Sequence, residues 1–185
     1  MISIREATDP DVRAIEAVRR ASWRAAYRGL IEQVYLDRAT VGGTEPPRLP
    51  SWRRTLVAVG EDGSAVAGYV SFGPERIVHL YTAGAQGSLP RFTEAGAAGE
   101  AGEVYAIYLD PGYWSTGAGR VLMDAAVARL TAAGYARAVL WVLEGNARAR
   151  RFYELAGWKP DGTDNPLPSL GGVIETRYTR SLAGV

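Results

Sequence analysis

The sequence predicts a mixed α/β (α+β) domain in which a central, mostly antiparallel sheet is flanked by helices. Short alternating apolar segments occur near both ends of the chain, and segments with helical spacing lie between them. A pair of apolar runs separated by an Asp-Gly turn is typical of a β-hairpin. Because 185 residues can bury one core of ordinary size, residues 1–185 are expected to form a single domain.

The N-terminal half predicts a strand, two helices and a hairpin. Alternation around Ile2 and Ile4 indicates the first strand, and Asp9-Pro10-Asp11 then opens an amphipathic helix. The next expected elements are a short helix around residues 31–36 and strands at 56–59 and 66–72, which form a hairpin across Asp62-Gly63.

The C-terminal half predicts three strands and two helices after a long loop. Residues 81–102 are rich in small residues, and we interpret them as a lid or substrate loop. The elements that follow are a buried strand at 104–109, a helix from the glycine-rich run to Gly134, a strand at 138–143, a helix from Asn146 to Gly157, and a final strand at 173–178.

The stretch from Tyr105 to Arg120, YAIYLDPGYWSTGAGR, is the most informative segment. A buried strand ends near Asp110, and a run of small residues from Ser115 to Gly119 then opens a helix. The first turn of a helix has unpaired N–H groups and the positive end of the helix dipole, so it can hold an anion by main chain alone. The segment therefore predicts a phosphate-binding loop.

Two common phosphate loops do not match these residues. A Walker-type loop ends in Gly-Lys-Ser/Thr, whereas the single lysine of this chain is Lys159, far downstream. The dinucleotide fingerprint needs a third small residue where this chain has Leu122, and the expected acidic residue is missing. Neither ATP nor NAD is favoured.

The segment from Trp114 to Gly119 instead resembles the acetyl-CoA loop of the GNAT N-acetyltransferase superfamily, Gln/Arg-x-x-Gly-x-Gly/Ala. Trp114 departs from this pattern because it stands where the family usually has Gln or Arg. A second block, LWVLEGNARARRFYELAGW from Leu140 to Trp158, resembles the family's strand, Asn, helix and Phe-Tyr-Glu segment. The resemblance implies a GNAT-like fold, acetyl-CoA as cosubstrate, and transfer of its acetyl group to a primary amine of a small molecule or peptide.

The resemblance also implies which residues hold the cosubstrate. The matching positions are Tyr108, Leu109, Trp114, Ser115, Thr116, Gly117, Ala118, Gly119, Arg120 and Asn146. Main-chain groups at Tyr108 and Leu109 would hold the pantetheine arm and the developing oxyanion, for which no particular side chain is needed. Asn146 can be a helix cap, a CoA contact or both.

Acetyl transfer needs one group that takes a proton from the amine and another that gives a proton to the departing sulfur. Glu103 matches a Glu that serves as base in several family members, and its alternative is a solvent-facing carboxylate at a strand end. Tyr153 matches the family's Tyr in Phe-Tyr-Glu, and a phenol with a pKa of about 10 can protonate a thiolate whose pKa is about 8.5. Its alternative is an amphipathic core tyrosine.

The composition of the chain indicates whether a metal, nucleic acid or a membrane is an expected partner. The chain has no cysteine, and its one histidine, His79, has no second ligand of the His or Cys type, so no metal is expected. The balance of 21 basic and 20 acidic residues gives no net field for nucleic acid. No signal segment and no membrane-length apolar run occur, which predicts a cytoplasmic protein without membrane association.

Some alternatives remain open from sequence. A free edge on the final strand, residues 173–178, could pair with a second copy to form a homodimer. The unusual Trp114 leaves room for a CoA-binding sensor or interaction module without catalysis. A transferase for a longer acyl group is a further alternative, and it would need a wider pocket around the thioester.

Overall fold

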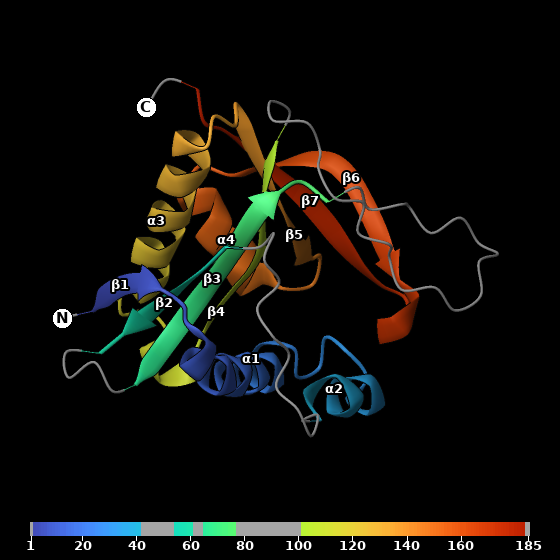
Figure 1. Ribbon diagram of the computed structural model, residues 1–185. Helices are drawn as coiled ribbons and strands as arrows, with labels where there is room; N and C mark the ends of the chain where they lie inside the picture. The colour runs from blue at the N-terminus through green and yellow to red at the C-terminus, as the bar shows by residue number, and fades with distance from the viewer. Residues whose placement is uncertain (1, 42–53, 61–64, 77–100, 184–185) are drawn as a thin grey trace.

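The computed structural model describes residues 2–41, 54–60, 65–76 and 101–183, which form one sheet flanked by helices (Figure 1). The strands are β1 (Ser3–Glu6), β2 (Arg54–Val59), β3 (Val66–Pro74), β4 (Gly102–Leu109), β5 (Arg137–Leu143), β6 (Lys159–Leu167) and β7 (Val173–Ser181). The α-helices are α1 (Val12–Ala26), α2 (Gln33–Thr40), α3 (Ala118–Ala132) and α4 (Ala147–Leu155), and short 3-10 helices span Asp9–Asp11, Pro111–Tyr113 and Pro168–Leu170.

The sheet has the order β1-β2-β3-β4-β5-β7-β6, and every neighbouring pair is antiparallel except β4 with β5. The predicted mixed fold with a mostly antiparallel sheet is therefore confirmed. The hairpin of β2 and β3 is present, although its turn at 61–64 lies outside the described residues. Residues 81–100 of the predicted loop and His79 also lie outside the described residues. The last residue of the predicted loop, Gly102, is the first residue of β4.

Two predictions about the C-terminal end were wrong. No strand was expected between Gly157 and Val173, yet β6 spans most of this interval. Its Pro160 and Pro166 are tolerated because β6 is an edge strand with a single neighbour. β7 lies between β5 and β6, so it offers no free edge through which a homodimer could form.

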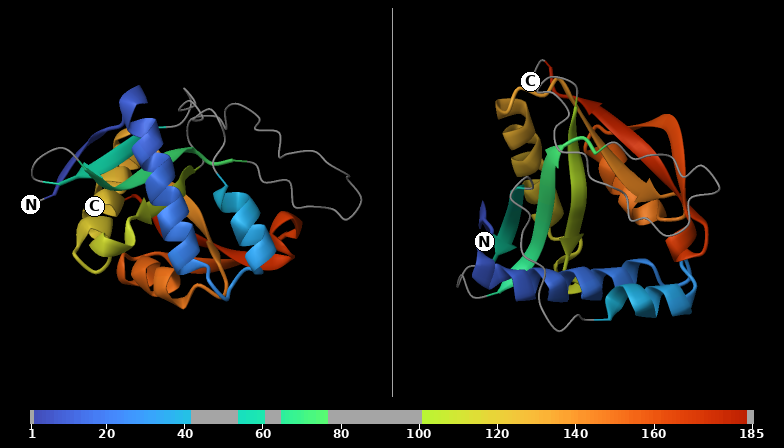
Figure 2. Two further views of the ribbon diagram at one scale, coloured as in Figure 1. Left: turned by 90° about the horizontal axis from the view of Figure 1, so that it is seen from below. Right: turned by 45° about the vertical axis from the view of Figure 1, so that its right-hand side comes forward.

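Helices cover both faces of the sheet, as the two views of Figure 2 show. Ile15 and Val18 of α1 pack with Tyr69 and neighbouring β2 residues on one face. On the other face α3 and α4 pack against β2 to β5, with Leu122 and Trp158 among the buried residues. No helix in the described ranges is both long and apolar enough to cross a membrane.

A β-bulge in β4 determines where the sheet opens. Ser71 of β3 pairs with Ala106 and Phe72 pairs with Val104, so Tyr105 is an extra residue on β4. The parallel ladder with β5 joins only Gly102–Val104 to Ala138–Leu140, and beyond it the two strands diverge (Figure 2, right). The backbone of β4 after the bulge therefore has sheet partners on the β3 side alone.

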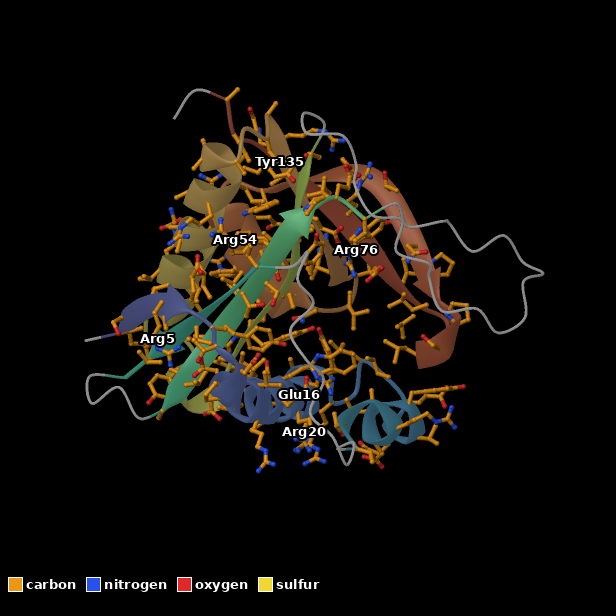
Figure 3. All side chains as sticks on the ribbon, viewed as in Figure 1. Arg5, Glu16, Arg20, Arg54, Arg76 and Tyr135 are labelled. Carbon is orange, nitrogen blue, oxygen red and sulfur yellow. The ribbon has the colours of Figure 1, made fainter. Side chains whose placement is uncertain are left out.

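Asp11 ties the first strand to the start of α1. Arg5 on β1 donates two hydrogen bonds to its carboxylate, at 2.7 and 2.8 Å, and the Thr8 N–H and hydroxyl donate at 2.8 and 2.9 Å. Arg5 lies at the end of β1 beside α1 (Figure 3). These hydrogen bonds hold the pKa of Asp11 well below its usual range, with Arg5 as the largest cause.

We expect Asp11→Ala to lower the free energy of unfolding by about 2 kcal/mol at neutral pH, because a buried charge-assisted network is lost. A lowered pKa stabilises the fold above the unfolded value of about 3.9, and this contribution disappears as the pH falls through the folded value. Denaturant unfolding at pH 7 and pH 3 measures both effects. The control is Asp9→Ala, which removes an exposed carboxylate, and equal stability of the two variants would contradict the assignment.

Candidate active site

A cavity of about 520 Å³ lies where β4 and β5 diverge. Its wall is formed by the C-terminal part of α1, the end of β4, the loop before α3, the end of β5, α4 and the start of β7. Aromatic and aliphatic side chains make up much of the wall, with a few charged groups among them. A concave, mainly apolar site with few polar groups is typical of a small-molecule pocket.

The start of α3 presents free N–H groups at one end of this cavity. Gly117 caps the helix with a φ of 92°, a left-handed conformation that favours glycine. The N–H groups of Ala118 and Gly119 have no hydrogen-bond partner among the described residues. A Cβ on Gly119 would lie 3.3 Å from Leu109 Cδ1 and 3.5 Å from Phe152 Cε2, so a larger residue there would narrow the approach.

Trp114 anchors the loop to the end of β4. Its Nε1–H donates to the Leu109 carbonyl at 3.1 Å, and the Arg148 guanidinium lies over its ring at 4.2 Å from the centroid. Arg148 also donates to the Ser115 hydroxyl at 3.3 Å. Trp114 itself carries no charge, but it brings the positive charge of Arg148 to the loop.

The main chain at the end of β4 alternates in direction. The Asp110 N–H donates to the Ala67 carbonyl, and in an antiparallel ladder this places the Tyr108 main-chain groups toward β3 as well. The main-chain groups of Ile107 and Leu109 then point to the opposite side, where β5 has diverged. Of the two predicted backbone contacts, Leu109 faces the gap, whereas the main-chain groups of Tyr108 face β3. Ile107 was missed because the β-bulge decides which residues of β4 face the gap.

Tyr153 lies on α4 and lines the cavity. It is 9% exposed, its ring packs between Phe152 and Tyr178 at centroid distances of 5.3 and 6.3 Å, and its hydroxyl has no hydrogen-bond partner among the described residues. Burial raises the pKa of Tyr153 well above its usual value, and the nearby Tyr108 adds to the rise. The hydroxyl therefore keeps its proton at neutral pH and can act as a donor.

Glu103 is fully buried and forms an ion pair with Arg76. The Arg76 N–H donates to Oε2 at 2.8 Å, and its guanidinium donates to Oε1 through Nε at 3.0 Å and through Nη2. Arg76 lies just past the end of β3 (Figure 3). It lines the cavity, whereas Glu103 does not. The carboxylate therefore holds a cation at the cavity wall.

The end of the cavity away from α3 contains groups that the sequence analysis missed. Trp23 and Tyr27 of α1 lie beside Tyr108, and the hydroxyls of the two tyrosines are 3.5 Å apart. Glu175 on β7 also lines the cavity, and burial raises its pKa above the usual value. The sequence had no signal for Glu175, because a carboxylate in an alternating strand is usually exposed.

The cavity brings together most of the predicted site residues. Those that line it are Tyr108, Leu109, Trp114, Ser115, Gly117, Gly119, Arg120, Asn146 and Tyr153. Ala118 is buried behind it, and Thr116 is exposed with its hydroxyl bonded to the Tyr113 carbonyl. Asn146 caps α4, because its side chain accepts the Ala149 N–H at 3.1 Å.

Comparison with known protein families finds a match to the acetyltransferase (GNAT) family over residues 15–158. The chain is 32% identical over 147 residues to the uncharacterized N-acetyltransferase YuaI of Bacillus subtilis, covering 79% of this chain and 74% of YuaI. It is 46% identical over 59 residues to the mycothiol acetyltransferase of Beutenbergia cavernae, but this match covers 32% of this chain and 20% of that protein.

Among solved structures, the PaiA N-acetyltransferase of Thermoplasma acidophilum, crystallised with coenzyme A, aligns with a TM-score of 0.73. The alignment covers 98% of this chain and 99% of PaiA at 19% identity, so this likeness concerns the fold.

The cap role of Asn146 can be measured by itself. We expect Asn146→Ala to lower the free energy of unfolding by about 1 kcal/mol, because the Ala149 N–H loses its acceptor. Asn146→Asp keeps an acceptor oxygen and should retain most of the stability. Denaturant unfolding of both variants tests this, and an alanine variant as stable as the wild type would contradict it.

Proposed function

Because the chain belongs to the acetyltransferase (GNAT) family, we propose that it transfers the acetyl group of acetyl-CoA directly to a primary amine of a small molecule or peptide. One observation carries the proposal: the glycine-rich start of α3 and the unpartnered Tyr153 hydroxyl open into the same cavity. An anion-binding helix start beside a proton donor is the arrangement that a thioester with a pyrophosphate needs.

The residues present fit acetyl-CoA. In this proposal Gly117 and Gly119 admit the pyrophosphate to the N–H groups of α3, and Arg120 and Arg148 at the cavity wall offset its charge. The main-chain groups of Ile107 and Leu109 can bond an extended pantetheine arm in the way a neighbouring strand would. Gly119 has no side chain and lies beside Leu109 and Phe152, so it leaves this path open.

Acetyl-CoA, when bound, supplies an activated acetyl group on sulfur. Tyr153 gives a proton to the departing sulfur. Its hydroxyl is protonated in the resting enzyme, and because burial raises its pKa the proton moves only as negative charge develops on the sulfur. The main-chain groups at the end of β4 provide fixed dipoles beside the reacting carbonyl, as the sequence analysis proposed for Leu109.

Glu103 remains a prediction for the base. Its two oxygens already accept hydrogen bonds from Arg76, so taking up a proton would cost this ion pair and release the guanidinium. Glu103→Gln therefore belongs in any set of variants that tests for a base.

Calorimetric titration with acetyl-CoA, followed by thiol release against a panel of amines, tests the function. We expect binding and amine-dependent thiol release. Binding without release from any amine would favour the CoA-binding sensor, and an absence of binding would contradict the proposal. Butyryl-CoA in parallel tests whether a longer acyl group is preferred.

We expect Gly119→Glu to weaken acetyl-CoA binding by at least 100-fold, because a carboxylate at the helix start repels the pyrophosphate and fills its path. Gly119→Ala is the matched control, since it adds a Cβ without charge and should bind within a few-fold of wild type. Calorimetry measures both, with thermal unfolding to confirm that each variant is folded. Equal affinities in the two variants would show that the anion lies elsewhere.

We expect Tyr153→Phe to lower kcat by about 100-fold while acetyl-CoA affinity stays within a few-fold of wild type, because only the proton donor is removed. Tyr178→Phe is the control, as this neighbouring buried tyrosine uses its hydroxyl in bonds with Arg150 and Glu154. It should lower the melting temperature and leave kcat unchanged. Equal losses of kcat in both variants would mean that Tyr153 acts only by packing.

A further inference from the structure

Building on the proposed acetyl transfer, we propose that Glu175 is the carboxylate that binds the acceptor's ammonium group and takes its proton. The acceptors are then amines that are cationic in water and carry an apolar or aromatic body. This assigns to β7 a catalytic role that the sequence analysis gave to Glu103.

Glu175 faces the cavity from its far wall. It lies near the start of β7 opposite Leu143 of β5, and among the described residues that line the cavity it is the one carboxylate. Glu103 lies behind Arg76 and outside this lining. An acceptor that enters the cavity therefore meets Glu175 and not Glu103.

Glu175 is also free to receive a cation. Its Oε1 accepts a hydrogen bond from Asn165 Nδ2 at 2.9 Å, and none of the described Arg or Lys side chains forms an ion pair with it. Burial raises its pKa, and Glu103 adds to the rise, while Asn165 and the charge of Arg76 act in the opposite direction. An ammonium ion in contact with this carboxylate would supply the missing counter-charge.

Aromatic rings border the same position. Trp23 lies 5.1 Å from Tyr27 and 6.4 Å from Tyr108 between ring centroids, and ring faces attract cations. The negative charge of Glu175 contributes to the raised pKa values of Tyr27 and Tyr108, after burial and closer neighbours. Tyr108 in turn contributes to the raised pKa of Tyr153. The Tyr108 ring therefore lies within electrostatic range of both the carboxylate and the proposed acid.

The proton balance assigns one role to each group. The ammonium gives a first proton to Glu175, directly or through water, and this proton later passes to solvent. The nitrogen then forms the C–N bond as the C–S bond breaks, and Tyr153 protonates the sulfur. The second proton of the nitrogen returns to Tyr153, so the products are an amide, a thiol and one released proton.

The test compares Glu175→Gln, Glu103→Gln and wild type with phenethylamine as a cationic acceptor, over a range of pH. We expect Glu175→Gln to lower kcat/KM by about 100-fold near pH 7 with acetyl-CoA affinity unchanged, and the loss to shrink toward pH 10, where the amine is neutral. Glu32→Gln, which neutralises an exposed carboxylate without a capping bond, is the control and should match wild type. A kcat/KM of Glu175→Gln within two-fold of the wild-type value would overturn the proposal. So would a loss of kcat/KM that shrinks at high pH in Glu103→Gln alone.

A second readout does not depend on turnover. Millimolar phenethylamine should raise the melting temperature of the wild type and of Glu32→Gln but not of Glu175→Gln. Equal shifts in wild type and Glu175→Gln would overturn the assignment. Failure of the wild type to bind acetyl-CoA in calorimetry would instead contradict the transferase, and the melting shifts would still decide whether Glu175 binds amines.

Discussion

The loss of pairing between β4 and β5 beyond Val104 is the constraint on which the rest of this structure depends. A single extra residue, Tyr105, bends β4 and moves Glu103, Ala106 and Tyr108 to one face of the sheet. Because β5 no longer pairs with residues 105–109, the backbone there is open to a ligand and the walls of a cavity can form around it. The sheet remains continuous because β5 stays paired with β7 along its whole length.

Two acids near this opening, the buried Glu103 and the half-buried Glu175, differ in their partners. Glu103 forms an ion pair with Arg76, whose guanidinium donates to one carboxylate oxygen and whose main-chain N–H donates to the other, so the two charges offset each other. Glu175 has one hydrogen bond from an amide and no paired cation among the described side chains. Desolvation penalises an unpaired carboxylate, so its environment favours either a proton or a bound cation. The same physical rule thus leaves one acid paired with an arginine and the other without a paired cation among the described side chains.

The chain is an acetyltransferase of the GNAT family, and its departure at Trp114 keeps a positive charge at the loop by another route. The indole bonds the end of β4 and stacks on Arg148, which comes from α4. Arg148, thirty-four residues downstream, thereby supplies the positive charge that an Arg at position 114 would offer locally. Such compensation depends on α4 lying beside the loop before α3, a relation that tertiary packing creates.

The sequence by itself determined the local elements and the glycine-rich start of α3, because helix spacing, turn residues and N–H groups at a helix start depend on near neighbours. It therefore predicted most of the helices and strands, and most of the residues that it proposed for the cosubstrate line the cavity together with Tyr153. It missed β6, whose prolines are tolerated only at an edge, and it placed β7 at an edge although β6 covers it. Only the tertiary structure separated Glu103 from Glu175, since the partner and burial of each carboxylate depend on strands far apart in the chain.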